Sequence, residues 1–305
     1  MKKAILTIAV LTFLLSVLSV AVQGASAIGE VKVPYAKTAP ILDGVIRSGE
    51  WTGGKSTFSK DTATLALSTA ASYDMAKFNF SFDCYYAWDE DYLYVAWDMQ
   101  GEDMWFDVGG NYIRMYIDPN GILNAYAEAQ NDEAKGAMPR LVAAVKKDGS
   151  GVFGLQHLGV DNIDYIEDED YALTLKENNK GWVIETRVAW SDMQSSVIAK
   201  TGNNDVTIVP KAGYTLRANY DCYHVTPDKS NKGFLTTSME QELNAKNVWN
   251  YSKYTNITLT LQAKDAGTVS PPTGSEITLI LFVCAASLLS MWYIKKHRNK
   301  SISYS

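Results

Sequence analysis

The most informative segment of this sequence is Cys84-Tyr-Tyr-Ala-Trp-Asp-Glu-Asp-Tyr-Leu-Tyr-Val-Ala-Trp-Asp-Met99. Its acidic residues 89–91 separate two runs rich in aromatic and β-branched side chains, which favour strands. The acidic break is typical of a tight turn, so the segment is predicted to be a β-hairpin. Because successive side chains of a strand point to opposite faces, the second arm has one core face and one face toward water or a ligand. The predicted core residues are Leu93, Val95, Trp97 and Met99. The opposite face carries Tyr92, Tyr94, Ala96 and Asp98.

Further strands are predicted on both sides of this hairpin. They cover residues 63–69, 77–87, 111–117, 181–190, 213–225 and 257–261. Asp43-Gly44 and Asp118-Pro119-Asn120-Gly121 are turn signals, and Ser191-Asp192-Met193 is typical of a helix cap. Residues 125–137 fit either a strand with a loop or a short helix, and residues 165–178 combine an acidic run with a short strand. Many short strands separated by Gly and Asp turns predict an all-β fold, a two-sheet antiparallel β-sandwich.

The N-terminus has the pattern of a secretory signal peptide. Lys2 and Lys3 form a basic start, residues 4–20 are apolar, and Ala25-Ser26-Ala27 matches a small-x-small cleavage site. Residues 1–27 are therefore predicted to be a signal peptide that is removed on export. An uncleaved anchor helix is the alternative.

The C-terminus carries a second targeting pattern. Residues 277–294 form an uncharged apolar run, which is long enough to span a bilayer. Residues 295–305 are basic, and basic residues next to a membrane span stay on the cytoplasmic side. This pattern predicts a transmembrane helix over residues 277–294 with a cytoplasmic tail.

The linker 263–276 contains Ser270-Pro271-Pro272-Thr273-Gly274. A Pro-x-Thr-Gly motif, an apolar span and a basic tail in that order resemble the sorting signal of Gram-positive surface proteins. In that family a sortase cleaves between Thr and Gly and joins the Thr to the cell wall. Ser270 stands where Leu is commoner, which resembles the signals of clostridial class B-type sortases. The resemblance implies an extracellular, wall-anchored protein with sortase and the cell wall as partners. A plain single-pass membrane anchor is the alternative.

The charge balance argues against a nucleic-acid partner. The chain has 28 Lys and Arg against 34 Asp and Glu, a net charge of −6. Several of the basic residues lie in the two terminal segments, so residues 28–262, the expected domain, are more acidic still. An acidic surface repels phosphate backbones.

Three cysteines are few for a disulfide scaffold. Cys284 lies in the apolar run, which leaves Cys84 and Cys222 in the domain. The sequence allows either one disulfide or two buried free thiols.

Five motifs follow one another along the domain, at residues 41–51, 88–96, 112–118, 181–190 and 213–219. In this order the series resembles the family 9 carbohydrate-binding modules, which belong to the DOMON-like β-sandwiches. The resemblance covers nearly all of residues 30–262. The resemblance implies a jelly-roll-like sandwich, a sugar held between two tryptophans, and structural calcium ions in loops. It therefore implies non-catalytic binding of a polysaccharide or oligosaccharide.

Two tryptophans occupy the places of the family's sugar clamp. Trp105 precedes the strand that ends in Asp118, and Trp249 precedes the last strand. Both lie in loop-like surroundings, which favours a surface role, and the alternative is that each plugs one end of the sandwich. A flat aromatic ring can stack on the apolar face of a sugar. The tryptophans expected in the core are Trp51, Trp88, Trp97, Trp182 and Trp190.

The polar part of the expected site departs from the family. Arg114 stands where the family has an acidic residue that holds sugar hydroxyls. Arginine only donates hydrogen bonds, so Arg114 would suit an acidic or differently oriented sugar. Asn219 occupies the place of a polar ligand contact. The fold is thus better supported than the sugar site.

Other chemistry is sparse. His157, His224 and His297 show no metal-type or triad spacing, so no enzyme is predicted. The acidic residues 167–170 could bind calcium, with a solvated loop as the alternative.

Two other functions stay open. One is a DOMON-type b-haem electron-transfer domain, with ligands among Met99, Met104, His157 and His224. The other is a wall-displayed adhesion or structural module without a sugar site.

Overall fold

The structure is a computed structural model, and it describes residues 29–47, 49–51, 53–65, 73–130, 138–156, 163–165, 167, 169–237 and 257–264. All of these belong to the unit Met1–Asp265. The expected signal peptide, sorting motif and transmembrane segment lie outside the described residues. Within the described ranges, the structure contains no helix that is both long and apolar enough to cross a bilayer.

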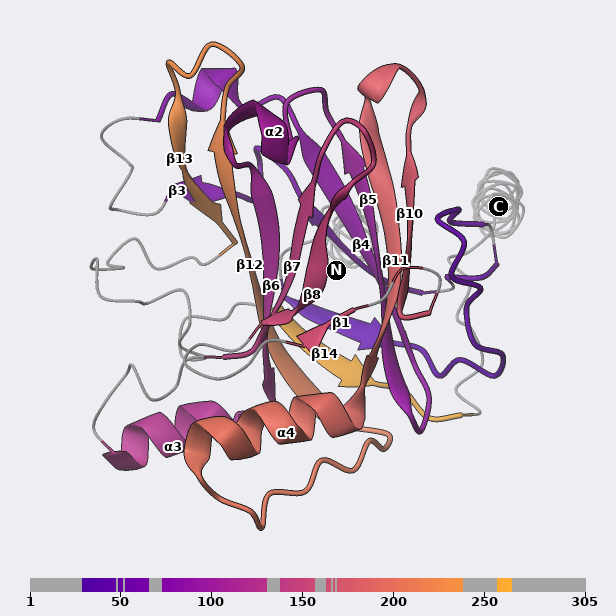
Figure 1. Cartoon of the computed structure of the whole chain (residues 1–305). Helices are drawn as coiled ribbons and strands as arrows, with labels where there is room; N and C mark the ends of the chain where they lie inside the picture. The colour runs from indigo at the N-terminus through magenta and orange to yellow at the C-terminus, as the bar shows by residue number, and fades with distance from the viewer. Residues whose placement is uncertain are drawn as a thin grey trace, which may run out of the picture. The chain divides into compact units, whose positions relative to one another are not determined.

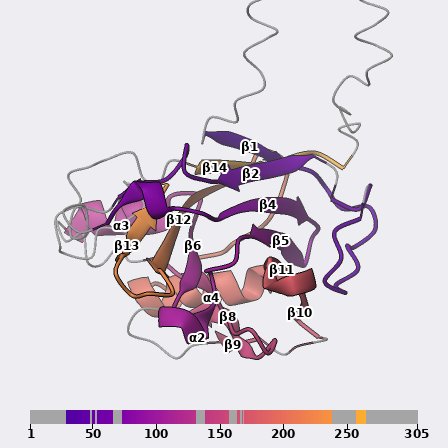
Figure 2. The same cartoon turned by 90° about the horizontal axis from the view of Figure 1, so that it is seen from above.

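Two β-sheets packed face to face form the domain (Figures 1 and 2). In the described residues the larger sheet has nine strands. Its main path runs through β1 (Glu30–Val33), β14 (Ile257–Leu261), β12 (Thr215–Val225), β6 (Tyr112–Pro119), β7 (Arg140–Val145), β8 (Gly151–Gln156) and β9 (Ile163–Asp164). Off this path, β13 (Lys232–Thr236) pairs with β12 and with β3 (Thr64–Leu65). The five-stranded sheet has the order β10 (Tyr171–Leu175), β11 (Gly181–Ala189), β5 (Tyr92–Gln100), β4 (Ser81–Trp88) and β2 (Gly54–Phe58). The predicted β-sandwich is confirmed.

The predicted hairpin is β4 and β5, which pair antiparallel and meet at Trp88 and Leu93. The carboxylate of Asp89 closes the turn, because it accepts hydrogen bonds from the backbone N–H groups of Asp91 and Tyr92 at 2.9 and 2.8 Å. All four predicted core residues of β5 are buried between the sheets. The five tryptophans expected in the core are buried as well, although Trp51 belongs to a smaller cluster on the outer face of β5. The alternation of the sequence therefore identified the inner face correctly.

The outer face of the hairpin differs from the prediction. Tyr94 and Ala96 are buried rather than exposed, because the segment 36–51 lies over them. Glu185 of β11 holds this segment: its carboxylate accepts hydrogen bonds from the backbone N–H groups of residues 43–45 and from the indole N–H of Trp51. This turn needs the glycine at position 44, where φ is +75° and a Cβ would lie 2.2 Å from Oγ1 of Thr174.

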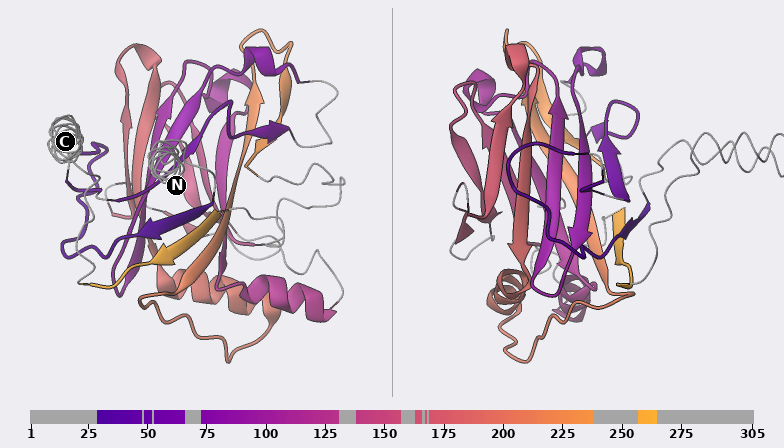
Figure 3. Two further views of the ribbon diagram at one scale, coloured as in Figure 1. Left: turned by 180° about the vertical axis from the view of Figure 1, so that it is seen from behind. Right: turned by 90° about the vertical axis from the view of Figure 1, so that its right-hand side faces the viewer.

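The first and last described strands of the domain run parallel, which the prediction of an antiparallel sandwich did not include. Strand β1 pairs with β14 from Glu30 opposite Thr258 to Val33 opposite Leu261. Figure 3 shows the two strands side by side. The pairing brings segments from both ends of the domain to the same edge of the larger sheet.

Two helices lie across one end of the sandwich (Figures 1 and 3). Helix α3 (Ile122–Gln130) shows that the helical alternative for this region is correct as far as residue 130. Asp118 caps it, since its carboxylate accepts hydrogen bonds from the N–H groups of Leu123 and Asn124. Helix α4 (Trp190–Thr201) starts earlier than predicted, so the expected cap at 191–193 lies within its first turn.

Cys84 and Cys222 are both free and fully buried. Of the two alternatives for this pair, the structure therefore has the two buried free thiols and not the disulfide. Burial raises the pKa of the Cys84 thiol to about 12. Its sulfur accepts a hydrogen bond from the hydroxyl of Tyr220 at 2.6 Å, in a buried chain that continues through Tyr86 to Ser56. These side chains link the two sheets across the core.

Candidate binding groove

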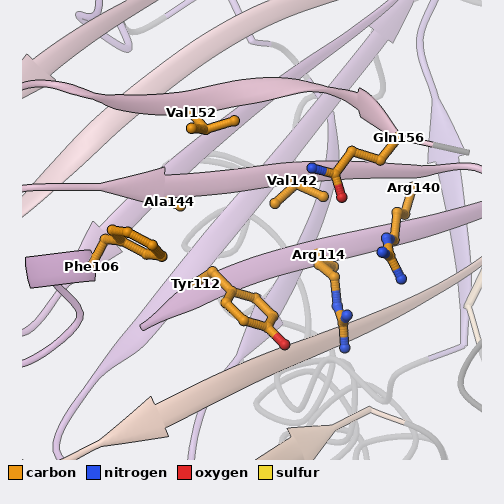
Figure 4. Close-up of a pocket in the computed structure, with 8 residues that line it drawn as sticks. All are labelled: Phe106, Tyr112, Arg114, Arg140, Val142, Ala144, Val152 and Gln156. Atoms are coloured by element: carbon orange, nitrogen blue, oxygen red, sulfur yellow. The ribbon is translucent and has the colours of Figure 1, made fainter. Parts of the chain in front are cut away.

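A groove of about 330 Å³ lies on the outer face of the larger sheet, where β6, β7 and β8 are neighbours (Figure 4). Its lining comes from these three strands and from the short helix α2 (Phe106–Gly109). The lining residues are Phe106, Tyr112, Arg114, Arg140, Val142, Ala144, Val152 and Gln156. We call this site the β6–β8 groove.

The strand register decides which side chains meet in the groove. Arg140 lies opposite Tyr116 of β6 on one side and opposite Gln156 of β8 on the other. Arg114 lies opposite Val142 in the same way. Because directly paired residues point to the same face of a sheet, these side chains share the outer face. The polar side chains gather at one end of the groove, and Phe106 and Val152 lie toward the other (Figure 4).

The apolar end of the β6–β8 groove presents exposed hydrophobic surface. Phe106 is 39% exposed and Val152 is 52% exposed. Tyr112 lies beside them, and its ring stacks on that of Tyr223 with centroids 5.9 Å apart. Burial raises the pKa of Tyr112, so its hydroxyl stays protonated and able to donate a hydrogen bond. The result is an aromatic platform with hydrogen-bonding groups at its edge.

The turn that contains α2 directs Phe106 outward. Gly110 adopts φ +78° and donates a backbone hydrogen bond to the carbonyl of Phe106 at 2.7 Å. Gly109 lies so close to β12 that a Cβ there would meet the Cβ of Val225 at 2.5 Å. Asn111 holds the same turn against β12. Its side-chain amide donates a hydrogen bond to the C=O of Val225 and accepts one from the N–H of Val225. This close packing leaves one side of the turn facing the core and the other facing the groove.

The expected surface position of Trp105 is wrong. Trp105 precedes α2 and is 0% exposed, on the core side of the turn. Its indole N–H is buried and has no hydrogen-bond partner in the part of the chain that the structure describes. The aromatic residue that reaches the groove is the next one, Phe106. The other expected clamp residue, Trp249, lies outside the described residues.

Arg114 lines the groove, but its guanidinium is occupied within the protein. Its Nε and one terminal nitrogen donate to the two carboxylate oxygens of Asp221 at 2.6 and 2.5 Å. The side chains are 11% and 0% exposed, and the hydroxyl of Tyr116 also donates to Asp221. Burial would lower the pKa of Arg114, but the charge of Asp221 raises it above the ordinary value. Arg114 is therefore a permanently charged and largely satisfied part of the wall.

Asn219 is buried beside the groove strands and does not line the groove. Its amide oxygen accepts a hydrogen bond from Thr237 at 2.7 Å, and its amide nitrogen donates to Thr236 at 3.2 Å. These bonds use the side chain to connect β12 with β13 and the residue after it. The expected ligand contact is thus a structural contact in this conformation.

Arg140 and Gln156 were missed because strands β7 and β8 were not predicted. The signal was present: two apolar runs flank Asp148-Gly149, a hairpin turn dipeptide. In the structure Gly149 adopts φ +86°, and Lys146 donates a backbone hydrogen bond to Ser150. The resulting hairpin supplies two of the polar side chains of the groove.

The described residues do not fit the haem alternative. His224 is fully buried, and its ring packs against those of Tyr73 and Phe80 with centroids 5.8 and 4.9 Å away. A haem bound by His224 would need the space that these rings fill. Met99 and Met104 are buried in the core, and His157 lies outside the described residues.

The acidic segment expected to bind calcium is only partly described. Glu167 and Glu169 are exposed, and Asp170 lies near Arg187 with 3.9 Å between the charged groups. In the part of the chain that the structure describes, no group of three or more His, Cys, Asp or Glu side chains could hold a metal ion. Calcium binding stays a prediction.

No family model matches the chain, and no curated protein matches it. The chain is similar to the structure of a carbohydrate binding module family 9 from Caldicellulosiruptor kristjanssonii in complex with cellotriose. The identity is 12% and the TM-score 0.45, over 79% of this chain and 98% of that chain. A structure of a module of the same family and organism in complex with glucose is similar at 12% identity and a TM-score of 0.44, over 78% and 98% of the two chains. At this identity the likeness says nothing about the side chains of the groove.

Proposed function

We propose that the domain binds a saccharide in the β6–β8 groove and does not catalyse a reaction on it. The observation that carries this proposal is the meeting of two kinds of group in one groove. Phe106 and Tyr112 offer aromatic surface, while Arg140 and Gln156 offer hydrogen-bond donors. The volume of about 330 Å³ lies at the small end of the roughly 300–1,000 Å³ typical of ligand sites, as suits a short stretch of sugar.

This combination matches the two surfaces of a pyranose. The axial C–H bonds of the ring form an apolar face that packs on an aromatic side chain. The hydroxyls at its rim need partners when water is displaced, because an unpaired polar group is costly to bury. Tyr112, Arg140 and Gln156 can provide such partners at the edge of the platform.

Among the described residues, the lining of the groove has none of the groups that sugar hydrolysis needs. The eight lining residues include no Asp, Glu or His. Glycoside hydrolysis ordinarily uses a pair of carboxyl groups, one of them as a proton donor. The proposal is therefore binding, in line with the resemblance of the sequence motifs to a family of non-catalytic modules.

The proposal includes display at the cell surface. The signal-peptide pattern at residues 1–27, the Ser270–Gly274 motif and the apolar run at 277–294 support export, sortase cleavage after Thr273 and attachment to a Gram-positive cell wall. A domain held in this way would fix its cell to a polysaccharide or capture a polysaccharide for it.

A glycan array with the full chain, purified in detergent, tests the binding proposal. Cellotriose and glucose, the sugars in the two similar structures, are suitable neutral probes beside acidic ones. Phe106→Ala and Tyr112→Ala should each weaken the best ligand about tenfold, the effect of a central aromatic contact. Val209→Ala is the control, since it removes an exposed apolar side chain that does not line the groove. Binding that survives both groove changes would place the sugar elsewhere, and no binding at all would favour an adhesion or structural module.

A further inference from the structure

The two arginines of the β6–β8 groove differ in one respect. Arg114 has Asp221 as a bidentate partner, so its charge is neutralised within the wall. Arg140 forms no ion pair and no side-chain hydrogen bond within the described ranges. Its Nε is nevertheless buried and lacks a hydrogen-bond partner among the described residues. Within that part of the chain, Arg140 is therefore a groove cation without a counter-charge and with a buried donor that is not used.

An unused guanidinium in a half-buried position is costly. A buried donor to which nothing bonds loses its hydration without compensation, and the cost is larger for charged groups. Tyr116 and Gln156, the cross-strand neighbours of Arg140, supply no negative charge. Among the eight lining residues there is also no acidic side chain. A positive site of this kind stands out in a chain whose net charge is −6.

A ligand with an anionic group would satisfy Arg140. The planar guanidinium offers parallel N–H donors that match two oxygens of one anion, a pairing that is stronger than a neutral hydrogen bond. The amide of Gln156, directly across the strand pair, can donate to the same group or to a neighbouring hydroxyl. The aromatic platform at the other end would hold the sugar ring (Figure 4).

We propose that the β6–β8 groove selects acidic saccharides, with Arg140 binding an anionic substituent of the sugar such as a uronate carboxylate or a sulfate ester. The inference rests on the proposed function, because it names the class of sugar that the same groove takes. Arg140 is thereby the residue that determines specificity, while Phe106 and Tyr112 supply affinity for sugars of either charge.

Binding titrations with the full chain in detergent test this assignment. The probes are oligomers of glucuronate, galacturonate and mannuronate, each beside its methyl ester, and a sulfated glucose oligomer beside its unsulfated form. The variants are Arg140→Gln, which removes the charge, and Arg140→Lys, which keeps the charge but loses the parallel N–H donors of the guanidinium. Lys32→Gln is the matched control, since it removes one exposed positive charge from β1, at the opposite end of the same sheet. Thermal melts show whether each variant is folded.

The expected result is that at least one acid binds about tenfold or more tightly than its neutral form. Arg140→Gln should abolish that preference, because it removes the charge and so weakens the acid far more than the neutral form. Arg140→Lys should retain part of the preference. The probe that binds more tightly than its neutral form shows whether Arg140 binds a carboxylate or a sulfate group. Equal binding of acids and neutral forms, or an unchanged preference in folded Arg140→Gln, would overturn the inference and leave the proposed function standing. Absence of binding to every probe and to the glycan array would overturn both.

Discussion

Trp105 and Phe106 are adjacent in the chain but lie on opposite sides of the turn that begins α2. Trp105 is 0% exposed and belongs to the core, whereas Phe106 is 39% exposed and lines the β6–β8 groove. The close approach of Gly109 to Val225 holds the turn against β12 and so determines which aromatic side chain faces outward. The aromatic residue that we propose contacts the sugar is therefore displaced by one residue from the position that the sequence motif indicated.

The two alanine variants at this turn should behave oppositely. Trp105→Ala should lower the free energy of unfolding by about 3–5 kcal/mol, because it leaves a large cavity in the core. Phe106→Ala should change stability by less than about 1 kcal/mol and weaken saccharide binding about tenfold. Urea denaturation and titration of both variants distinguish these effects. If Trp105→Ala stayed as stable as the wild type and lost binding, the burial of Trp105 would be wrong.

The pair of Arg114 and Asp221 should be important for stability. Asp221→Asn leaves the largely buried guanidinium without its counter-charge and should cost about 3–5 kcal/mol. Changing both residues, as Arg114→Met with Asp221→Leu, should cost less than Asp221→Asn alone, since no unpaired charge is left. Equilibrium unfolding in urea gives both values. A cost below about 1 kcal/mol for Asp221→Asn would mean that the pair behaves as a solvent-exposed ion pair.

Stability should depend on pH through His224. Burial lowers the pKa of His224 to about 4 in the folded protein, with a smaller opposing effect of the Asp103 charge. The ordinary value is 6.5, so between these values the unfolded chain binds more protons than the folded one. The contribution of neutral His224 to the free energy of unfolding is therefore complete above pH 6.5, and it is lost as the pH falls toward 4.

From pH 7 to pH 5 this histidine alone should remove about 2 kcal/mol from the free energy of unfolding. His224→Asn keeps an acceptor for Tyr73 but does not titrate in this range, so its pH dependence should be weaker by that amount. Urea denaturation of both proteins at several pH values measures the difference. Parallel pH profiles would show that His224 does not titrate differently in the two states.

Glu185 should anchor the segment 36–51. Glu185→Ala removes the acceptor of three backbone N–H groups and of the Trp51 indole, and should cost about 3 kcal/mol or more. Because the segment covers Tyr94, the variant should also be cut by proteases within 36–51 faster than the wild type. Glu177→Ala, at an exposed position, is the control. Unchanged proteolysis of Glu185→Ala would show that other contacts hold the segment.

The sorting motif predicts covalent attachment to the wall. Most mature protein should resist detergent extraction and be released by enzymes that digest the wall. Thr273→Ala removes the residue at which the sortase would cleave and should shift the protein to the membrane fraction or the medium. Fractionation of cells followed by immunoblotting measures both. Extraction of the wild type by detergent alone would leave a simple membrane anchor as the explanation.

The sequence was sufficient for the features that depend on local pattern. The period-2 alternation identified the β4–β5 hairpin, its inner face and the sandwich, because burial between two sheets requires an apolar residue at every second position. The same alternation identified β11, and β14 was predicted with the observed bounds. The sequence left two alternatives open that the structure has since decided. Cys84 and Cys222 are buried free thiols, and the short helix considered for residues 125–137 is observed as α3, which starts at Ile122.

Only the tertiary structure decided which outer faces are covered and where the groove lies. The outer face of β5 is closed by a segment that Glu185 holds from more than a hundred residues away. Arg140 is brought between Tyr116 and Gln156 by strand pairing, and Phe106 is turned outward by the packing of Gly109 on Val225. Each of these results from contact between distant segments, and such contacts leave no periodic signal in the sequence because either partner alone is compatible with many neighbours.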